Sequence, residues 1–232
     1  MSETFVIPIE SNPEVLNKFL IKLGVSEDFS LTDVYGLDPD LLAILPQPVL
    51  AFILLFPCSE NYYNHRHEEN EKLKEKPQKI PENLFYMHQF LRNACGTIAL
   101  FHAVLNNLEK IQLKDGAMKN FYEKTKNLSP EDKGRILEND QEIIKIHQSF
   151  ANEGQTEVPN AEDKVYFHFI ALTRVGDNLM ELDGTRKIPI NHGKTSDETF
   201  MFDAAEICKK FINREKNDCR FTIMALAASC DQ

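Results

Sequence analysis

The chain has 232 residues, 42% of them hydrophobic, which is enough for one well-buried core and crowded for two. We therefore expect a single domain over residues 1–232. Thirty-six acidic residues against twenty-six basic ones leave a formal charge of −10. This excess argues against nucleic acid and anionic membranes, whose phosphates are bound by clustered Lys and Arg. A basic protein partner suits the charge better, because opposite charges speed encounter, although solubility alone explains it equally well.

No secretory leader or membrane span is expected. The N-terminus lacks a basic stretch followed by a long apolar one. The longest apolar run, Val49 to Phe56, is too short to cross a bilayer. The five cysteines form no CxxC pair, which is typical of reduced thiols, and no Gly-rich phosphate loop implies a nucleotide cofactor. We expect a cytoplasmic or nuclear protein that is monomeric and needs no cofactor.

Helix and strand signals alternate in the first part of the chain. Phe5 to Ile9 predicts a short strand. Ser11-Asn12-Pro13 is typical of a helix start and Gly24 of its end, with apolar residues at helical spacing between them. Asp38-Pro39 predicts a second, short helix through Ile44. Val49 to Phe56 is apolar without alternation, which predicts a strand buried on both faces.

The middle of the chain combines polar stretches with one strongly apolar helix. Asn64 to Pro81 is nearly all polar, which predicts a mobile excursion rather than a domain boundary. Gly96 to Leu108 is apolar on all sides, so this helix should be central. A charged helical region follows, with a further helix start at Ser129-Pro130-Glu131. Phe150 to Lys164 has almost no large apolar residue, which predicts a long exposed loop, a feature that is often functional.

The last third predicts a hairpin, a helix and a strand. Val165 to Val175 and Leu179 to Leu182 are expected to pair around Gly176-Asp177. Asp197 to Asn213 is helical, and Arg220 to Ala227 is a final strand. Strands and helices are interleaved without an internal repeat. The expected fold class is α/β, with helices covering a central sheet.

Cys95 stands at the start of the apolar helix. A helix N-terminus and a nearby imidazolium lower the pKa of a thiol and make it nucleophilic. Gly96 leaves the space over the sulfur open. Gln89 can place a side-chain N–H beside the backbone N–H of Cys95, and each donor of such an oxyanion hole stabilises a transition state by roughly 3–4 kcal/mol. Taken alone, the same cysteine is also compatible with a buried, inert thiol.

His168 and Asp183 complete the candidate chemistry if the hairpin has a two-residue turn. Val175 then pairs with Asn178, and Asp183 becomes a diagonal neighbour of His168 on the same face. A three-residue loop would place the two side chains on opposite faces. In the first case the carboxylate holds the imidazole in the tautomer that accepts the thiol proton.

Six motifs occur in one order along the whole chain and together resemble the ubiquitin C-terminal hydrolase family of papain-like cysteine proteases. The chain is most similar to the small, single-domain members that release short adducts. The resemblance implies a papain-like fold with a central, mainly antiparallel sheet, a knotted chain and a loop that crosses over the active site. It also implies roles for Cys95 as nucleophile, Gln89 as oxyanion donor, His168 as general base and Asp183 as its orienting acid. The motifs are DVYGLDP, QFLRNACGTIAL, EGQTE, HFIAL, ELDG and PINHG.

The resemblance further implies a surface that binds ubiquitin. It consists of the first strand–helix junction, an acidic residue near the basic ubiquitin tail, the crossover loop, and a stretch before the last strand. These residues are Pro8, Ile9, Glu10, Ser11, Asn12, Pro13, Asp33, Ala151, Asn152, Glu153, Gly154, Gln155, Thr156, Glu157, Val158, Asp218, Cys219, Arg220, Phe221, Thr222 and Ile223.

The expected function is therefore a deubiquitinating thiol protease that cuts small adducts or short peptides from the C-terminus of ubiquitin. Activity on related ubiquitin-like modifiers (a deneddylase activity) is compatible with the same resemblance. A Cys-His-Asp acyltransferase, which passes the thioester to an amine, and a non-catalytic ubiquitin-binding protein are the alternatives. The run His65 to Glu69 offers metal ligands, but it lacks further ligands at zinc spacing, so a solvated loop is favoured over a metal site.

Overall fold

A computed structural model of the chain describes residues 5–153, 166–215 and 218–229. Within these residues, the helices are α1 (Pro13–Leu23), α2 (Pro39–Leu42), α3 (Glu60–Glu75), α4 (Cys95–Leu105), α5 (Ala117–Thr125), α6 (Pro130–Glu138), α7 (Gln141–Ala151) and α8 (Phe200–Arg214). The strands are β1 (Phe29–Asp33), β2 (Val49–Pro57), β3 (Phe167–Val175), β4 (Asn178–Leu182), β5 (Ile190–Lys194) and β6 (Thr222–Ala228).

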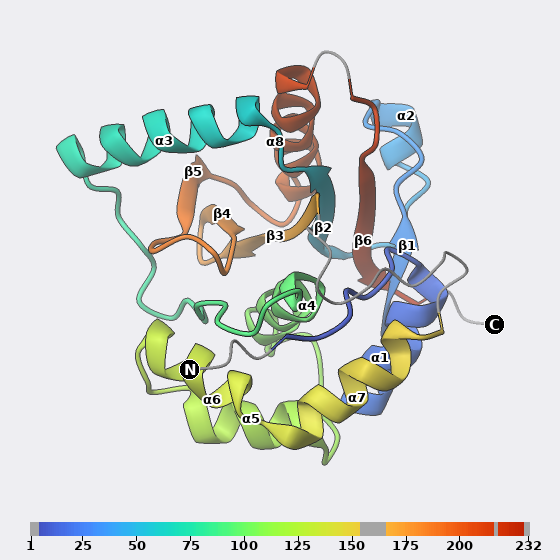
Figure 1. Cartoon of the computed structure of the whole chain (residues 1–232). Helices are drawn as coiled ribbons and strands as arrows, with labels where there is room; N and C mark the ends of the chain where they lie inside the picture. Colours follow the sequence, from blue (N-terminus) through green and yellow to red (C-terminus); the bar gives the residue numbers. More distant parts are fainter. Residues whose placement is uncertain (1–4, 154–165, 216–217, 230–232) are drawn as a thin grey trace.

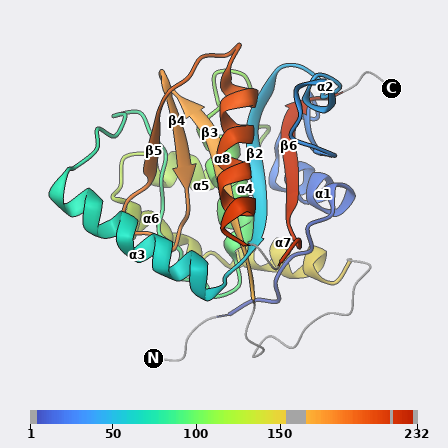
Figure 2. The ribbon, with the colours of Figure 1, turned by 90° about the horizontal axis from the view of Figure 1, so that it is seen from above.

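The six strands form one sheet in the order β1-β6-β2-β3-β4-β5, and every neighbouring pair is antiparallel. Helix α8 covers one face of the sheet and α4 the other, where α1 packs beside it against β1, while α5, α6 and α7 lie outside these two helices (Figures 1 and 2). The expected α/β class with helices covering a central sheet is confirmed. Both outer strands are hydrogen-bonded to amide side chains. On β1, the side chain of Asn17 from α1 bonds the backbone N–H and C=O of Leu31. At β5, the side chain of Gln78 accepts from the N–H of Asn191 and donates to the carbonyl of Pro189. These bonds pair edge groups that would otherwise be open to another chain.

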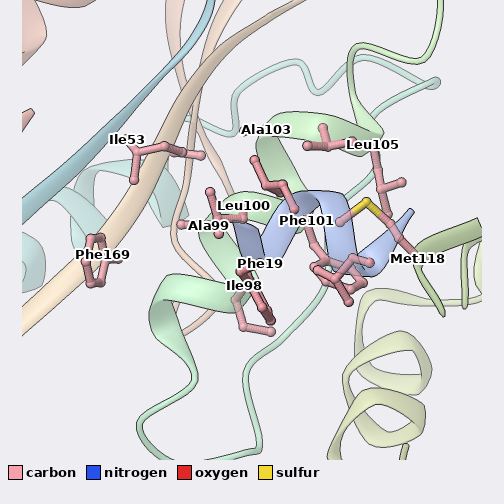
Figure 3. Close-up of a cluster of buried hydrophobic side chains, with 14 of the residues drawn as sticks. Phe19, Ile53, Ile98, Ala99, Leu100, Phe101, Ala103, Leu105, Met118 and Phe169 are labelled. Atoms are coloured by element: carbon pink, nitrogen blue, oxygen red, sulfur yellow. The ribbon is translucent and has the colours of Figure 1, made fainter. Parts of the chain in front are cut away.

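Helix α4 is the centre of the larger hydrophobic core, as its apolar sequence predicts. All of its eleven residues are buried. Figure 3 shows Ile98 and Phe101 of this helix among Ile53 and Phe169 from the sheet and Phe19 and Met118 from the outer helices. The helix begins at Cys95, one residue earlier than predicted. Because a helix buried on every side has no freedom to rotate, the side chain at its first residue has a fixed place.

The predicted hairpin is also confirmed. Val175 pairs with Asn178 and Ala171 with Leu182, so Gly176-Asp177 is a two-residue turn. Gly176 has a φ of +58°, a left-handed conformation that glycine adopts at little cost. The register therefore continues toward His168 on one strand and the residues after Leu182 on the other. Helix α1 likewise starts after Asn12, whose side chain accepts from the Glu14 N–H, and ends at Gly24.

The prediction of a mobile excursion over residues 64–81 is wrong, because most of it belongs to α3. Ser59 caps this helix by accepting from the N–H of Tyr62, and Lys72 and Lys74 lie in its last turn. Tyr62 is its one buried residue within the described structure. A helix that buries a single side chain carries almost no apolar periodicity, which is why its sequence resembles a solvated loop.

Other boundaries differ from expectation at the ends of elements. Phe5 forms only an isolated bridge to Arg92, so Phe5 to Ile9 is not a strand, and Pro8 lacks the N–H that a ladder needs. Phe150 and Ala151 belong to α7 rather than to a loop, and the rest of the predicted loop from residue 154 onward lies outside the described residues. The short strands β1 and β5 were missed, since each has five residues with little apolar content.

Candidate active site

Cys95 lies at the first position of α4, and the N-terminus of a helix favours a negatively charged side chain. Asn93, two residues earlier, has a φ of +66° and turns the chain into the helix. Asparagine is among the few residues that tolerate this left-handed conformation. The Cys95 side chain is nearly enclosed, with 6% of its residue surface exposed.

The imidazole of His168, near the start of β3, acts on the Cys95 thiol, and each group shifts the pKa of the other. Burial raises the pKa of Cys95, but the hydrogen bond to His168, the charge of this imidazole and the backbone N–H groups of Phe169 and Gly96 outweigh it, so the pKa lies below that of an ordinary thiol. Burial lowers the pKa of His168, but Asp183 and Cys95 outweigh that effect and hold it well above the usual value. The pair therefore favours a thiolate beside an imidazolium, which is the nucleophilic form.

Asp183 directly follows β4 and accepts from the Nε2 atom of His168 at 2.7 Å. Because this bond occupies Nε2, the Nδ1 atom is the one left for the thiol. Thr185 donates to the same carboxylate oxygen through its backbone N–H at 2.9 Å and its hydroxyl at 2.7 Å. Burial opposes ionisation of Asp183, but the charge and hydrogen bond of His168, with Arg66 and Thr185, hold its pKa well below the usual range. The carboxylate is therefore charged and keeps the imidazole oriented.

Helix α3 contributes a second layer that sequence reasoning missed. The Tyr62 hydroxyl donates to Oδ2 of Asp183 at 3.1 Å, and Arg66 Nη1 lies 3.3 Å from the Tyr62 oxygen and 3.6 Å from Oδ2. Arg66 also donates to the hydroxyl and carbonyl oxygens of Thr185 at 2.8 and 2.7 Å. Since Arg66 donates to the Tyr62 oxygen, the Tyr62 proton is left to point at the carboxylate. The only sequence signal for this role is the N-cap Ser59 that places Tyr62 in the first turn of α3.

Gln89 is held next to the same loop, since its backbone N–H donates to the carbonyl of Gly184 at 2.7 Å. A β-carbon added to Gly184 would come within 2.7 Å of Ile98 and 3.2 Å of the Gln89 β-carbon, so only glycine allows this approach. One amide N–H of Gln89 bonds the Leu91 carbonyl at 3.2 Å. An amide nitrogen carries two hydrogens, so the second remains available to an oxyanion.

Gly96 makes room for the N-terminal segment of the chain. A β-carbon at Gly96 would lie 2.6 Å from Cγ2 of Ile9 and 3.4 Å from the Phe169 ring. The glycine therefore allows the N-terminal segment to pack on the nucleophile helix.

The candidate ubiquitin-binding residues within the described structure form two groups. Pro8 to Pro13 leads into α1, and Glu153, just after α7, acts electrostatically on Lys18 of α1. The second group joins Asp33 at the end of β1 to the stretch Asp218 to Ile223, since Asp33 pairs with Met224. Ile9, Ala151 and Ile223 are buried; Asn152, Glu153, Cys219 and Arg220 are exposed; and Pro8, Glu10, Ser11, Asn12, Pro13, Asp33, Asp218, Phe221 and Thr222 are half-buried.

Residues 154–158, the remainder of the candidate crossover segment (Gly154, Gln155, Thr156, Glu157 and Val158), lie outside the described residues. Among the described residues, no helix is long and apolar enough to span a membrane and no group of three His, Cys, Asp or Glu is arranged to hold a metal. The run His65 to Glu69, considered above for its potential ligands, is part of α3.

The geometry defines a cysteine hydrolase site of the Cys-His-Asp kind, and the backbone of Gln89 is bonded to the residue after Asp183. A family model described as "Ubiquitin carboxyl-terminal hydrolase, family 1" matches residues 6–213. The chain belongs to this family and is an enzyme of the cysteine-hydrolase class.

Relatives match over nearly the whole chain. A ubiquitin carboxyl-terminal hydrolase of Drosophila melanogaster is 54% identical over 96% of this chain and 97% of its own length. The isozyme L1 of Monodelphis domestica is 44% identical over 94% and 96%. Among solved structures, the Trichinella spiralis UCH37 catalytic domain bound to ubiquitin vinyl methyl ester superposes with a TM-score of 0.76 at 24% sequence identity. The match covers 97% of this chain and 96% of that one, and it supports the fold.

Proposed function

We propose that this enzyme is a deubiquitinating cysteine hydrolase that releases small adducts and short peptides from the C-terminus of ubiquitin. The observation that carries the proposal is the Cys95–His168–Asp183 arrangement in a chain that matches the family almost end to end. The relatives named above are ubiquitin carboxyl-terminal hydrolases, and one solved relative was captured with a ubiquitin vinyl methyl ester.

The site residues divide the reaction between them. The Cys95 thiolate attacks the carbonyl carbon at the ubiquitin C-terminus, and the free N–H of Gln89 stabilises the oxyanion that forms. His168 gives its proton to the departing amine or alcohol, which leaves a thioester on Cys95. A water molecule then loses its proton to His168, attacks the thioester and releases free ubiquitin. Asp183 keeps the ring in position throughout both steps.

The acidic balance supports a basic partner. Each of the three candidate binding segments, residues 8–13, 151–158 and 218–223, contains at least one acidic residue, and the candidate residue at the end of β1 is Asp33. Among the candidate binding residues that the structure describes, the acidic ones are Glu10, Asp33, Glu153 and Asp218. We expect kcat/KM on ubiquitin substrates to fall as salt rises, through slower association. A flat response between low and physiological salt would assign the charge to solubility alone.

Small leaving groups are the proposed substrates, because the family resemblance implies a loop that crosses over the active site, and such a loop admits only what can thread it. The test is a comparison of ubiquitin carrying a C-terminal fluorophore with folded di-ubiquitin. We expect fast release of the fluorophore and almost no cleavage of di-ubiquitin. Fast cleavage of both substrates would contradict this selectivity.

Ubiquitin-like modifiers form a second class of proposed substrates, since the chemistry requires only a carbonyl group at the C-terminus of the modifier and a small leaving group. Parallel assays with a C-terminal fluorophore on ubiquitin and on each related modifier rank these substrates by kcat/KM.

An acyltransferase shares the triad and differs only in the group that accepts the acyl group from the thioester. Adding a primary amine and measuring the ratio of amide to free acid separates the two, and hydrolysis predicts mostly free acid.

A further inference from the structure

A buried histidine outside the catalytic residues joins three parts of the chain. His147, on α7, is 1% exposed. Its Nδ1 atom lies 2.7 Å from the hydroxyl of Thr97, and its Nε2 atom lies 2.7 Å from the carbonyl oxygen of Ile7. Thr97 is two residues after Cys95 in the first turn of α4, and Ile7 directly precedes the candidate binding segment 8–13.

The two contacts determine where the hydrogens lie. The Ile7 carbonyl can only accept, so Nε2 carries the proton. In the neutral ring Nδ1 is then an acceptor, and the Thr97 hydroxyl donates to it. Burial lowers the pKa of His147, which favours this neutral form. The ring thus uses its single donor and its single acceptor to connect Ile7, in the N-terminal segment 6–13, to Thr97 of the nucleophile helix α4.

The same segment touches the flanks of the nucleophile at two more points. The N–H of Val6 donates to the carbonyl of Arg92 at 3.1 Å. Ile9 packs so closely on Gly96 that a β-carbon there would come within 2.6 Å of its methyl group. Residues 6–9 therefore contact the chain on both sides of Cys95, and the hydrogen bond from His147 lies between these two contacts.

We propose that His147 is a positioning residue that holds the segment 6–13 against α4 and thereby sets the affinity for ubiquitin. This inference rests on the proposed function, in which residues 8–13 contact ubiquitin. A segment ordered before binding loses little freedom when the partner arrives, whereas a loosened one must be ordered by the partner at the expense of affinity. The effect of His147 should therefore appear in KM and in the dissociation constant rather than in the chemical step.

The test compares His147→Leu with His147→Gln on ubiquitin carrying a C-terminal fluorophore, with active enzyme counted by titration of Cys95. Leucine removes both hydrogen bonds. We expect KM to rise about tenfold, because the loss of one buried hydrogen bond costs ~1.4 kcal/mol and this energy corresponds to a tenfold change in affinity. The kcat per active site should change much less. Glutamine offers an amide N–H donor and a carbonyl oxygen acceptor, and it should restore most of the lost affinity.

Thr97→Val isolates one of the two bonds without changing the shape of the side chain, and it should also raise KM. The matched control is Thr125→Val, which removes a buried hydroxyl bonded to the Phe121 carbonyl inside α5. This control should lower stability without raising KM. If His147→Leu does not fold, the Thr97 and Thr125 pair decides the question alone.

Amide hydrogen exchange separates failure of this inference from failure of the proposed function. Peptides covering residues 5–13 should exchange faster in His147→Leu and Thr97→Val, whatever the substrate of the enzyme proves to be. Unchanged exchange and unchanged KM in a folded His147→Leu enzyme would overturn the positioning role. A wild-type enzyme without activity on ubiquitin would instead refute the function, while faster exchange would still support the link between His147 and the segment.

Discussion

The Nε2 atom of His168 lies 2.7 Å from Oδ1 of Asp183, although fifteen residues and a complete hairpin separate them in the chain. The distance follows from the two-residue turn at Gly176-Asp177, which sets the register of β3 and β4. One inserted residue in this turn would move Asp183 to the other face. The orientation of the general base is therefore set by the turn of a hairpin.

Asp183→Asn should lower kcat by several orders of magnitude while KM changes little. An amide cannot carry the negative charge that stabilises the His168 imidazolium, and its N–H group favours the wrong tautomer of the ring. Steady-state kinetics on a ubiquitin fluorophore and a thermal unfolding curve check this. An undiminished kcat in a folded variant would place the orienting acid elsewhere.

Tyr62→Phe should lower kcat about tenfold, since it removes one hydrogen bond to a buried carboxylate. Burial raises the pKa of Tyr62, and the negative charge of Asp183 raises it further. The Tyr62 hydroxyl therefore stays protonated and can donate. Tyr122→Phe on α5 is the matched control, because it makes the same change at a ring that packs on Phe85. Equal kcat values for the two variants would show that the contact from α3 is dispensable.

Gln89→Ala should reduce kcat by about 10²–10³-fold, the usual cost of losing one oxyanion donor. Gly184→Ala should produce a smaller loss of the same kind, because its methyl group must displace Ile98 or Gln89. Both losses should appear in kcat at unchanged KM. Ubiquitin binding measured in the Cys95→Ala background provides the control, and weakened binding there would mean that Gln89 acts on affinity.

The lowered pKa of Cys95 and the raised pKa of His168 predict the pH dependence of the enzyme. Below the pKa of Cys95 the thiolate is protonated, and above the pKa of His168 the leaving group loses its acid. Activity should therefore be flat around neutral pH and fall on either side. Alkylation by iodoacetamide should stay fast at acidic pH values where glutathione no longer reacts. A rate that follows glutathione would contradict the ion pair.

The sequence predicted the parts of the site that depend on local rules. The N-terminal position of Cys95 follows from the apolar helix after it, and the approach of His168 to Asp183 follows from turn length and strand alternation. It did not predict Tyr62 and Arg66, because α3 reaches Asp183 through a single buried side chain in an otherwise charged helix. Nor did it predict His147, whose partners lie 50 and 140 residues away.

The most direct test of the account is hydrolysis of ubiquitin with a C-terminal fluorophore by the wild-type and Cys95→Ala proteins, with ubiquitin binding measured for both. The account predicts rapid release by the wild type, none by Cys95→Ala, and similar dissociation constants, because the sulfur contributes a nucleophile and almost no binding area. Continued turnover by Cys95→Ala, or a wild-type enzyme that leaves ubiquitin intact, would contradict it.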